Sequence, residues 1–153
     1  MQINELPYVD EHSVVIAAGA DDVWAALGEL DNAFSRAGVA AYARAVGCAD
    51  YRASGPRPLI EGSSIPGFGV VAAVPRSDLV LAGRHRFSSY ALTFRIDELS
   101  AGRSRLRAES RAAFPGLTGT VYRMLVIGTG GHVIGMRRLL SGIKRAAELR
   151  TRS

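Results

Sequence analysis

The chain has 153 residues, of which 48% are hydrophobic and 22% charged, a composition typical of a globular domain and not of a disordered segment. No apolar run reaches the roughly 18 residues that a membrane-spanning helix needs, and the polar, acidic first eleven residues do not resemble a secretory signal. Cys48 is the only cysteine, which excludes an internal disulfide and the paired cysteines of zinc or redox motifs. We therefore expect one cytoplasmic domain spanning residues 1–153, without a transmembrane segment, metal or cofactor.

The net charge of +5 is unevenly distributed along the chain. Residues 1–50 carry eight acids and two arginines, a net charge of −6, whereas residues 51–153 carry seventeen basic residues and six acids, a net charge of +11. Lys144 is the only lysine, and arginine is the side chain best suited to phosphates. A bias toward Ala, Gly and Arg can also result from the base composition of the coding sequence alone, without any role in phosphate binding. We prefer that interpretation and expect no specific nucleic-acid binding.

The first part of the chain predicts one strand, two helices and a long connection. Residues 8–18 are rich in β-branched side chains and predict the strand. Residues 20–22 supply an N-cap and an acidic first turn for a helix that ends near Leu30. A second helix is predicted over residues 33–45. Glycines and prolines over residues 46–67 indicate an irregular connection, of the kind that often forms a lid or an entrance.

The next 47 residues predict a meander of four antiparallel strands, over residues 68–74, 79–87, 90–99 and 104–114. In the third strand, Tyr90, Leu92, Phe94 and Ile96 share one face, and polar residues occupy most of the other. One apolar and one charged face is what an antiparallel sheet covered on a single side requires.

The charged face of this sheet carries the arginines Arg84, Arg86, Arg95, Arg105, Arg107 and Arg111. Asp97 and Glu109 share that face and partly balance its charge, so we interpret it as a solvated surface. The alternative is an electrostatic surface for an acidic partner, a membrane or RNA. Against RNA, the face has no interleaved aromatic side chains on which bases could stack.

Pro115 and Gly116 end the strand pattern, and residues 118–150 are predicted to be mainly helical. An apolar stripe along this segment consists of Leu125, His132, Met136, Leu139, Leu140, Ile143 and Ala147. Glycines at positions 128, 130 and 131 interrupt the segment. Because each helical glycine costs about 1 kcal/mol relative to Ala, we expect a kink or a break there.

The glycine cluster also resembles a phosphate-binding loop. A Rossmann fingerprint would need glycine at Val133, and a Walker loop would need Lys followed by Ser or Thr. Only 18 residues follow Gly135, too few for the helix and second strand of a βαβ unit. We therefore expect the glycines to let the helix approach the sheet or bend over a pocket.

This order of elements predicts an α+β helix-grip fold, in which a curved antiparallel sheet wraps around a long C-terminal helix, with two short helices after the first strand. Residues 14–27, VVIAAGADDVWAAL, resemble the start of the START-like, or SRPBCC, superfamily of polyketide cyclases/dehydrases and lipid-transfer domains. Residues 83–92 and 114–123 resemble an uncharacterised bacterial branch of it. The resemblance implies a cavity for a hydrophobic ligand, but members range from carriers to cyclases.

Histidines and tyrosines are the candidate polar groups of such a cavity. His12, His85 and His132 lie on three separate predicted elements without metal-ligand spacing, so we expect no metal site. His85 faces inward by strand alternation, and His132 lies on the apolar stripe. Both are either satisfied core residues or, with Tyr90 and Tyr122, groups that hydrogen-bond a ligand oxygen or transfer protons.

The predicted function is therefore binding of an apolar or aromatic small molecule, lipid- or polyketide-like, in an internal cavity between the sheet and the C-terminal helix. The predicted ligand-binding residues are His85, Phe87, Tyr90, Leu92, Phe94, Tyr122, Leu125, His132 and Met136, and no catalytic residue is assigned. One alternative is a cyclase/dehydratase-type enzyme that uses the same cavity. Another is an interaction module that uses the arginine face. A homodimer is left open.

Overall fold

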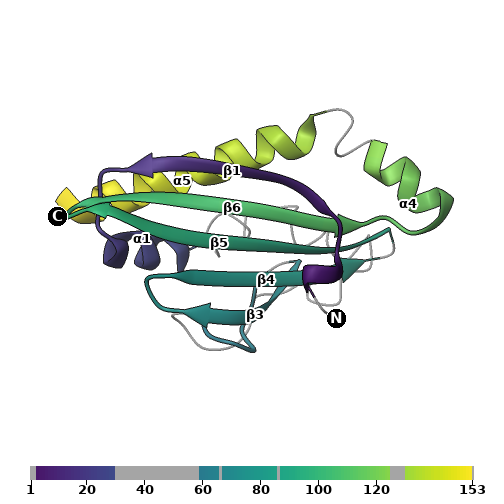
Figure 1. Ribbon diagram of the computed structural model, residues 1–153, viewed down its shortest axis with the longest axis horizontal. Coiled ribbons are helices and arrows are strands. Elements are labelled where there is room, and N and C mark those ends of the chain that lie inside the picture. Colours follow the sequence, from purple (N-terminus) through teal and green to yellow (C-terminus); the bar gives the residue numbers. More distant parts are fainter. Residues whose placement is uncertain (1–2, 30–58, 66, 86, 125–129, 153) are drawn as a thin grey trace.

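A computed structural model describes residues 3–29, 59–65, 67–85, 87–124 and 130–152 (Figure 1). Its elements in chain order are η1 (Ile3–Glu5), β1 (Tyr8–Ile16), α1 (Ala20–Leu27), β2 (Ser64–Ile65), β3 (Phe68–Val74), β4 (Asp78–His85), β5 (Ser88–Ser100), β6 (Arg103–Ala113), α4 (Gly116–Arg123) and α5 (Gly131–Arg152). The predicted helix over residues 33–45 lies outside the described residues.

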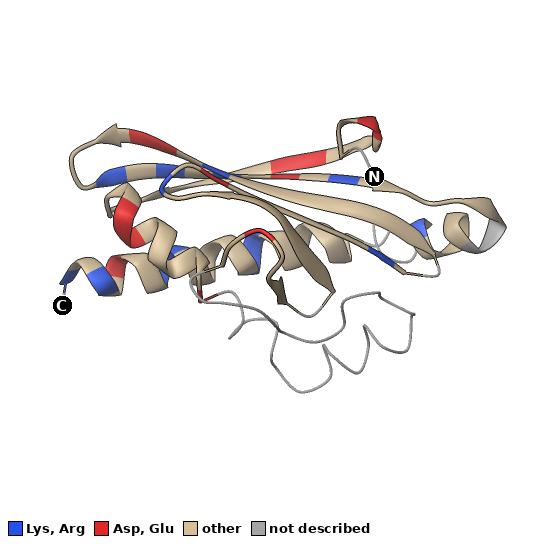
Figure 2. Ribbon diagram, turned by 90° about the horizontal axis from the view of Figure 1, so that it is seen from below, with Lys and Arg blue, Asp and Glu red and all other residues tan. Residues whose placement is uncertain are grey.

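The six strands form one sheet in the order β1-β6-β5-β4-β3-β2, and every neighbouring pair is antiparallel. β2 to β6 form a meander, and β1 joins its far edge beside β6. Helix α5 runs along one face of the sheet, which we call the inner face, while α4 lies beyond the end of the strands (Figures 1 and 2). This arrangement confirms the predicted helix-grip fold.

The hydrophobic core lies between the inner face and the helices. Leu92, Phe94 and Leu106 of the sheet are buried together with Met136 and Leu140 of α5. Full burial of each such side chain stabilises the fold by about 1.5–3 kcal/mol. The alternation predicted for β5 and the apolar stripe predicted for α5 therefore meet in one core, with α1 packed beside them.

Two local predictions are wrong. The N-cap of α1 is Gly19, which makes no side-chain cap, and the helix already begins at Ala20. The helix ends at Leu27, before the predicted Leu30. The predicted irregular connection over residues 46–67 contains the short strand β2 in its described part, where Ser64 and Ile65 pair with β3.

The predicted C-terminal helical segment consists of two helices, α4 and α5. Gly130 directly precedes α5 with a φ of 77°, a left-handed conformation that an α-helix does not contain, so the predicted helix is broken there and not kinked. No parallel strand pair occurs in the part of the sheet that the structure describes. The βαβ context that a nucleotide-binding loop requires is therefore missing from the described sheet.

Three of the five described arginines of the outer face are paired with acids: Arg95, Arg107 and Arg111. Arg107 makes two hydrogen bonds to Asp97, at 2.7 and 3.2 Å, and lies 3.5 Å from Glu11. Glu109 accepts a hydrogen bond from Arg111 at 2.7 Å and lies 3.6 Å from Arg95. Figure 2 shows the basic and acidic positions interspersed along the strands. This pairing supports the interpretation of a solvated face whose charge is partly balanced. Arg86 lies outside the described residues.

No helix in the described ranges is long and apolar enough to cross a membrane.

Candidate functional site

Four aromatic rings meet where the ends of β4 and β5 approach α4. The His85 ring lies 4.9 Å from the Tyr122 ring and 5.5 Å from the Tyr90 ring, centroid to centroid. Phe87 stacks on Tyr122 at 5.3 Å with an interplanar angle of 17°. We call these four residues the aromatic cluster. Each was predicted as a ligand-binding residue, and the structure brings them together.

The position of Tyr90 in this cluster depends on two glycines. Its hydroxyl donates a hydrogen bond to the Gly67 carbonyl oxygen, and its ring lies over Gly83 of the neighbouring strand. A Cβ atom at Gly83 would lie 2.3 Å from the Gly67 oxygen and 2.7 Å from the Tyr90 ring. Only glycine at position 83 leaves room for the Tyr90 ring in this orientation. Phe68 packs edge-on against the same ring at 5.1 Å.

Tyr122 is held in the cluster by close packing of α4. Pro115 and Gly116, which has a φ of 71°, turn the chain from β6 into this helix. A Cβ atom at Gly119 would lie 2.6 Å from the backbone of Phe114 and 3.1 Å from the Phe87 carbonyl oxygen. The missing side chain therefore lets α4 approach the strand ends closely, which brings Tyr122 within reach of His85.

His85 brings an imidazole into the cluster. Its Nδ1 accepts a hydrogen bond from the backbone N–H of Phe87 at 3.0 Å. Burial lowers the pKa of His85 below its usual value of 6.5, so the imidazole is neutral at pH 7. A neutral imidazole that accepts at Nδ1 carries its proton on Nε2. The side chain therefore presents one N–H donor among aromatic rings.

The other predicted residues lie in different surroundings. Leu92, Phe94 and Met136 are buried in the main core, and Leu125 lies outside the described residues. His132 does not join the aromatic cluster; its Nε2 lies 3.2 Å from Asp10 Oδ1. Asp10 and its other partner, His12, were not predicted as site residues.

Two ring contacts of the cluster were also missed by the sequence prediction. Phe68 contacts Tyr90, and Phe114 lies 6.3 Å from Tyr122. Strand alternation could have placed Phe68 on the same face as Val70, two residues later. Val70 pairs with Leu81, so this is the inner face. Phe114 was counted in the predicted strand over residues 104–114, on the same face as Leu106, but it was not chosen as a site residue, and it lies just past the end of β6.

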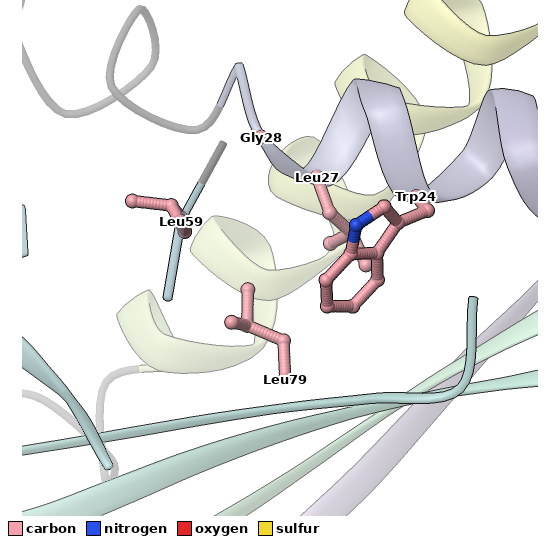
Figure 3. A pocket seen from close by; sticks show the side chains of 5 residues that line it. All are labelled: Trp24, Leu27, Gly28, Leu59 and Leu79. Atoms are coloured by element: carbon pink, nitrogen blue, oxygen red, sulfur yellow. The ribbon is translucent and has the colours of Figure 1, made fainter. Parts of the chain in front are cut away.

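A separate apolar pocket lies at the opposite end of β4, beside α1 (Figure 3). Trp24, Leu27 and Gly28 line it from the α1 side, Leu79 from β4, and Leu59 from the connection before β2. Its volume is about 10 Å³, room for about one water molecule. Ligand pockets for drug-sized molecules usually hold about 300–1,000 Å³. This pocket is smaller, and none of the nine predicted residues lines it.

No group of three or more His, Cys, Asp or Glu side chains within the described ranges is arranged to hold a metal ion.

No protein-family model matches the sequence, and no curated protein matches it. Solved structures match the fold over nearly the whole chain. The ZhuI aromatase/cyclase from Streptomyces sp. R1128 has a TM-score of 0.59 at 17% identity, covering 97% of this chain and 98% of that one. The di-domain ARO/CYC protein BexL of the BE-7585A biosynthetic pathway has a TM-score of 0.58 at 14% identity, over 94% of this chain and 47% of its own.

A polyketide-cyclase-like protein from Corynebacterium glutamicum has a TM-score of 0.52 at 13% identity, covering 93% of this chain and 92% of that one. At such identities the likeness establishes the fold alone. The chain therefore has the helix-grip fold of polyketide-cyclase-like proteins, and the resemblance noted in the sequence is confirmed at that level.

Proposed function

We propose that the protein binds an apolar or aromatic small molecule against the inner face of the sheet, at the aromatic cluster. The observation that carries the proposal is the convergence of four rings from two strands, the turn between them and a helix: His85, Phe87, Tyr90 and Tyr122. A flat apolar ligand gains contact area from such rings, and each aromatic pair adds about 0.5–1.5 kcal/mol beyond area burial. Structural neighbours described as aromatase/cyclases support the choice of ligand class.

His85 gives this site a means of orienting its ligand. An Nε2–H donor among aromatic rings favours a ligand with an acceptor oxygen, such as a ketone or phenol, at that position. A buried hydrogen bond of this kind contributes about 0.5–1.5 kcal/mol net. The site then selects ligands by shape and by one polar contact, as small-molecule sites generally do.

A second candidate function is a cyclase or dehydratase-type reaction at the same site. The Nε2–H of His85 favours it, because a donor facing a substrate carbonyl oxygen would stabilise the negative charge that develops there during enolisation. Binding and catalysis differ in the fate of the ligand. A carrier releases its ligand unchanged, whereas an enzyme releases a product of altered structure or mass.

Binding of the fluorescent probe N-phenyl-1-naphthylamine tests the proposal. We expect saturable binding, displaced by a non-fluorescent hydrophobic competitor, and weakened about tenfold or more by Tyr122→Ala because the stacked ring is lost. Tyr8→Ala is the matched control, since Tyr8 is 57% exposed at the start of β1. Equal affinities of both variants and the native protein would place binding elsewhere, and no binding at all would refute the proposal.

A further inference from the structure

Asp10 joins two histidines from opposite ends of the sequence. Its Oδ2 lies 3.0 Å from His12 Nε2, and its Oδ1 lies 3.2 Å from His132 Nε2 at the start of α5. All three side chains are about one-fifth exposed. One carboxylate therefore links the edge strand β1 to the helix that covers the inner face.

A β-bulge turns Asp10 toward this face. The pairing of β1 with β6 shifts register between Tyr8 and Asp10. Before the shift, Tyr8 pairs with Arg111 on the outer face; after it, Asp10 pairs with Ser110 and His12 pairs with the buried Ala108. Bulges re-aim side chains and occur often beside functional sites. Without this one, Asp10 would point to the outer face.

Ser110 adds an unpartnered hydroxyl beside Asp10. It is 5% exposed, and its Oγ has no hydrogen-bond partner among the described residues. It shares the inner face with Leu106 and Ala108, and it stands between Asp10 on β1 and Leu92 on β5. Buried polar atoms are almost always paired in folded proteins, so this hydroxyl calls for a partner that the described residues do not supply.

The chemistry of these groups is that of hydrogen-bond acceptors. Because a carboxylate only accepts hydrogen bonds, each histidine donates its Nε2–H to Asp10, and Nδ1 of such a ring is an acceptor wherever it carries no second proton. Neither Nδ1 has a hydrogen-bond partner in the described part of the chain. With the carboxylate and the Ser110 oxygen, the group offers acceptors to a ligand, whereas His85 offers a donor.

We propose that Asp10, His12, His132 and Ser110 form a polar subsite that accepts a hydrogen bond from a hydroxyl group of the bound molecule. This inference rests on the proposed function and narrows the ligand class to apolar or aromatic molecules that carry a hydroxyl donor. Ser110 donates its proton to the oxygen of that hydroxyl, and the proton of the hydroxyl is accepted by the Asp10 carboxylate or a histidine Nδ1, so the buried serine gains a partner.

Three related probes test the subsite: naphthalene, 2-naphthol and 2-methoxynaphthalene. The native protein is expected to bind 2-naphthol about fivefold tighter than either of the others, a ratio typical of one net hydrogen bond. Naphthalene is the control for ligand size. If the site merely had no room for the methoxy group, it would bind naphthalene as tightly as 2-naphthol.

Two variants locate the preference. Ser110→Ala and His132→Leu are expected to reduce the 2-naphthol preference toward unity while leaving naphthalene affinity nearly unchanged. Ser104→Ala is the matched control, because Ser104 is also buried on β6 but donates to the Ala18 carbonyl oxygen. That variant should lower stability and keep the preference.

The outcomes separate the two proposals. Native protein that binds naphthalene without preferring 2-naphthol overturns the polar subsite and leaves the proposed function standing. The subsite is also overturned if Ser110→Ala and His132→Leu weaken all three probes equally, since the side chains would then only fill space. Failure of every probe to bind overturns both proposals.

Discussion

His85 combines a fixed tautomer with a pKa lowered by burial. Because the folded state resists protonation of this ring, the unfolded chain binds more protons as the pH falls below 6.5. His85 therefore has no effect on the pH dependence of stability well above that value, and it makes the fold less stable as the pH falls through and below it. The same protonation adds a charge beside the rings of the aromatic cluster.

We predict that the His85 imidazole titrates with a midpoint below 6.5. The measurement is a pH titration of the histidine ring signals by NMR, with the His85 signal assigned by its loss in His85→Gln. The variant should also lose less stability between pH 7 and pH 5 than the native protein does. A midpoint at or above 6.5 would show that the ring is solvated or stabilised by a nearby negative charge.

At the scale of elements, α4 is the part of the site most dependent on a single residue. Gly119 has the Phe114 backbone only 2.6 Å from the place where a Cβ would be, and backbone cannot move aside as a flexible side chain can. We predict that Gly119→Ala displaces α4, destabilises the protein by about 1–3 kcal/mol through overpacking, and reduces probe binding. Urea unfolding and probe titration measure the two effects.

Gly142→Ala in α5 is the control for this prediction. A Cβ at Gly142 would meet no atom within 4 Å, and the residue is inside a helix. The substitution should stabilise the protein by about 0.5–1 kcal/mol through helix propensity, with no change in probe binding. If Gly119→Ala behaved like Gly142→Ala, the close approach of α4 would not be what positions Tyr122.

The other end of α5 is tied to the sheet by Glu148. This carboxylate accepts hydrogen bonds from Lys144 at 2.6 and 2.8 Å and from the backbone N–H of Ala17 at 2.8 Å. The bond from Lys144, followed by that from Ala17, lowers the pKa of Glu148 below its usual 4.5. The stabilising effect is therefore complete above pH 4.5 and is lost as the pH falls through the lowered pKa.

We predict that Glu148→Gln reduces stability at pH 7 and flattens the loss of stability on acidification below pH 4.5. Thermal unfolding at a series of pH values tests this. Glu98→Gln, at an exposed position of β5 without an ion pair among the described residues, is the matched control. Identical acid profiles for Glu148→Gln and the native protein would mean that the contact to Ala17 does not act in solution.

At the scale of the whole molecule, the sequence predicted those strands and helices of which only one side is buried. Leu92, Phe94 and Leu106 alternate with polar residues because one face of the sheet is covered, and the stripe of α5 repeats because one side of the helix is buried. The aromatic cluster followed from the same alternation for His85 and Tyr90.

The polar subsite could not be predicted in this way. Alternation counted from Tyr8 places Asp10 on the same face as Tyr8, and the bulge between them reverses that assignment. His132 and Asp10 are 122 positions apart, and only the crossing of α5 over β1 brings them together. The sequence also could not predict at which residue the C-terminal helical segment breaks, because glycines occur at positions 128, 130 and 131.

Intermolecular NOEs between bound N-phenyl-1-naphthylamine and isotope-labelled protein test the central claim most directly. The proposed binding mode predicts NOEs from the probe to the rings of His85 and Tyr122. It predicts none to Val15 and Val74, which are at least one-third exposed on other parts of the sheet. NOEs confined to such exposed side chains, or to the small pocket around Trp24 and Leu79, would contradict a ligand site at the aromatic cluster.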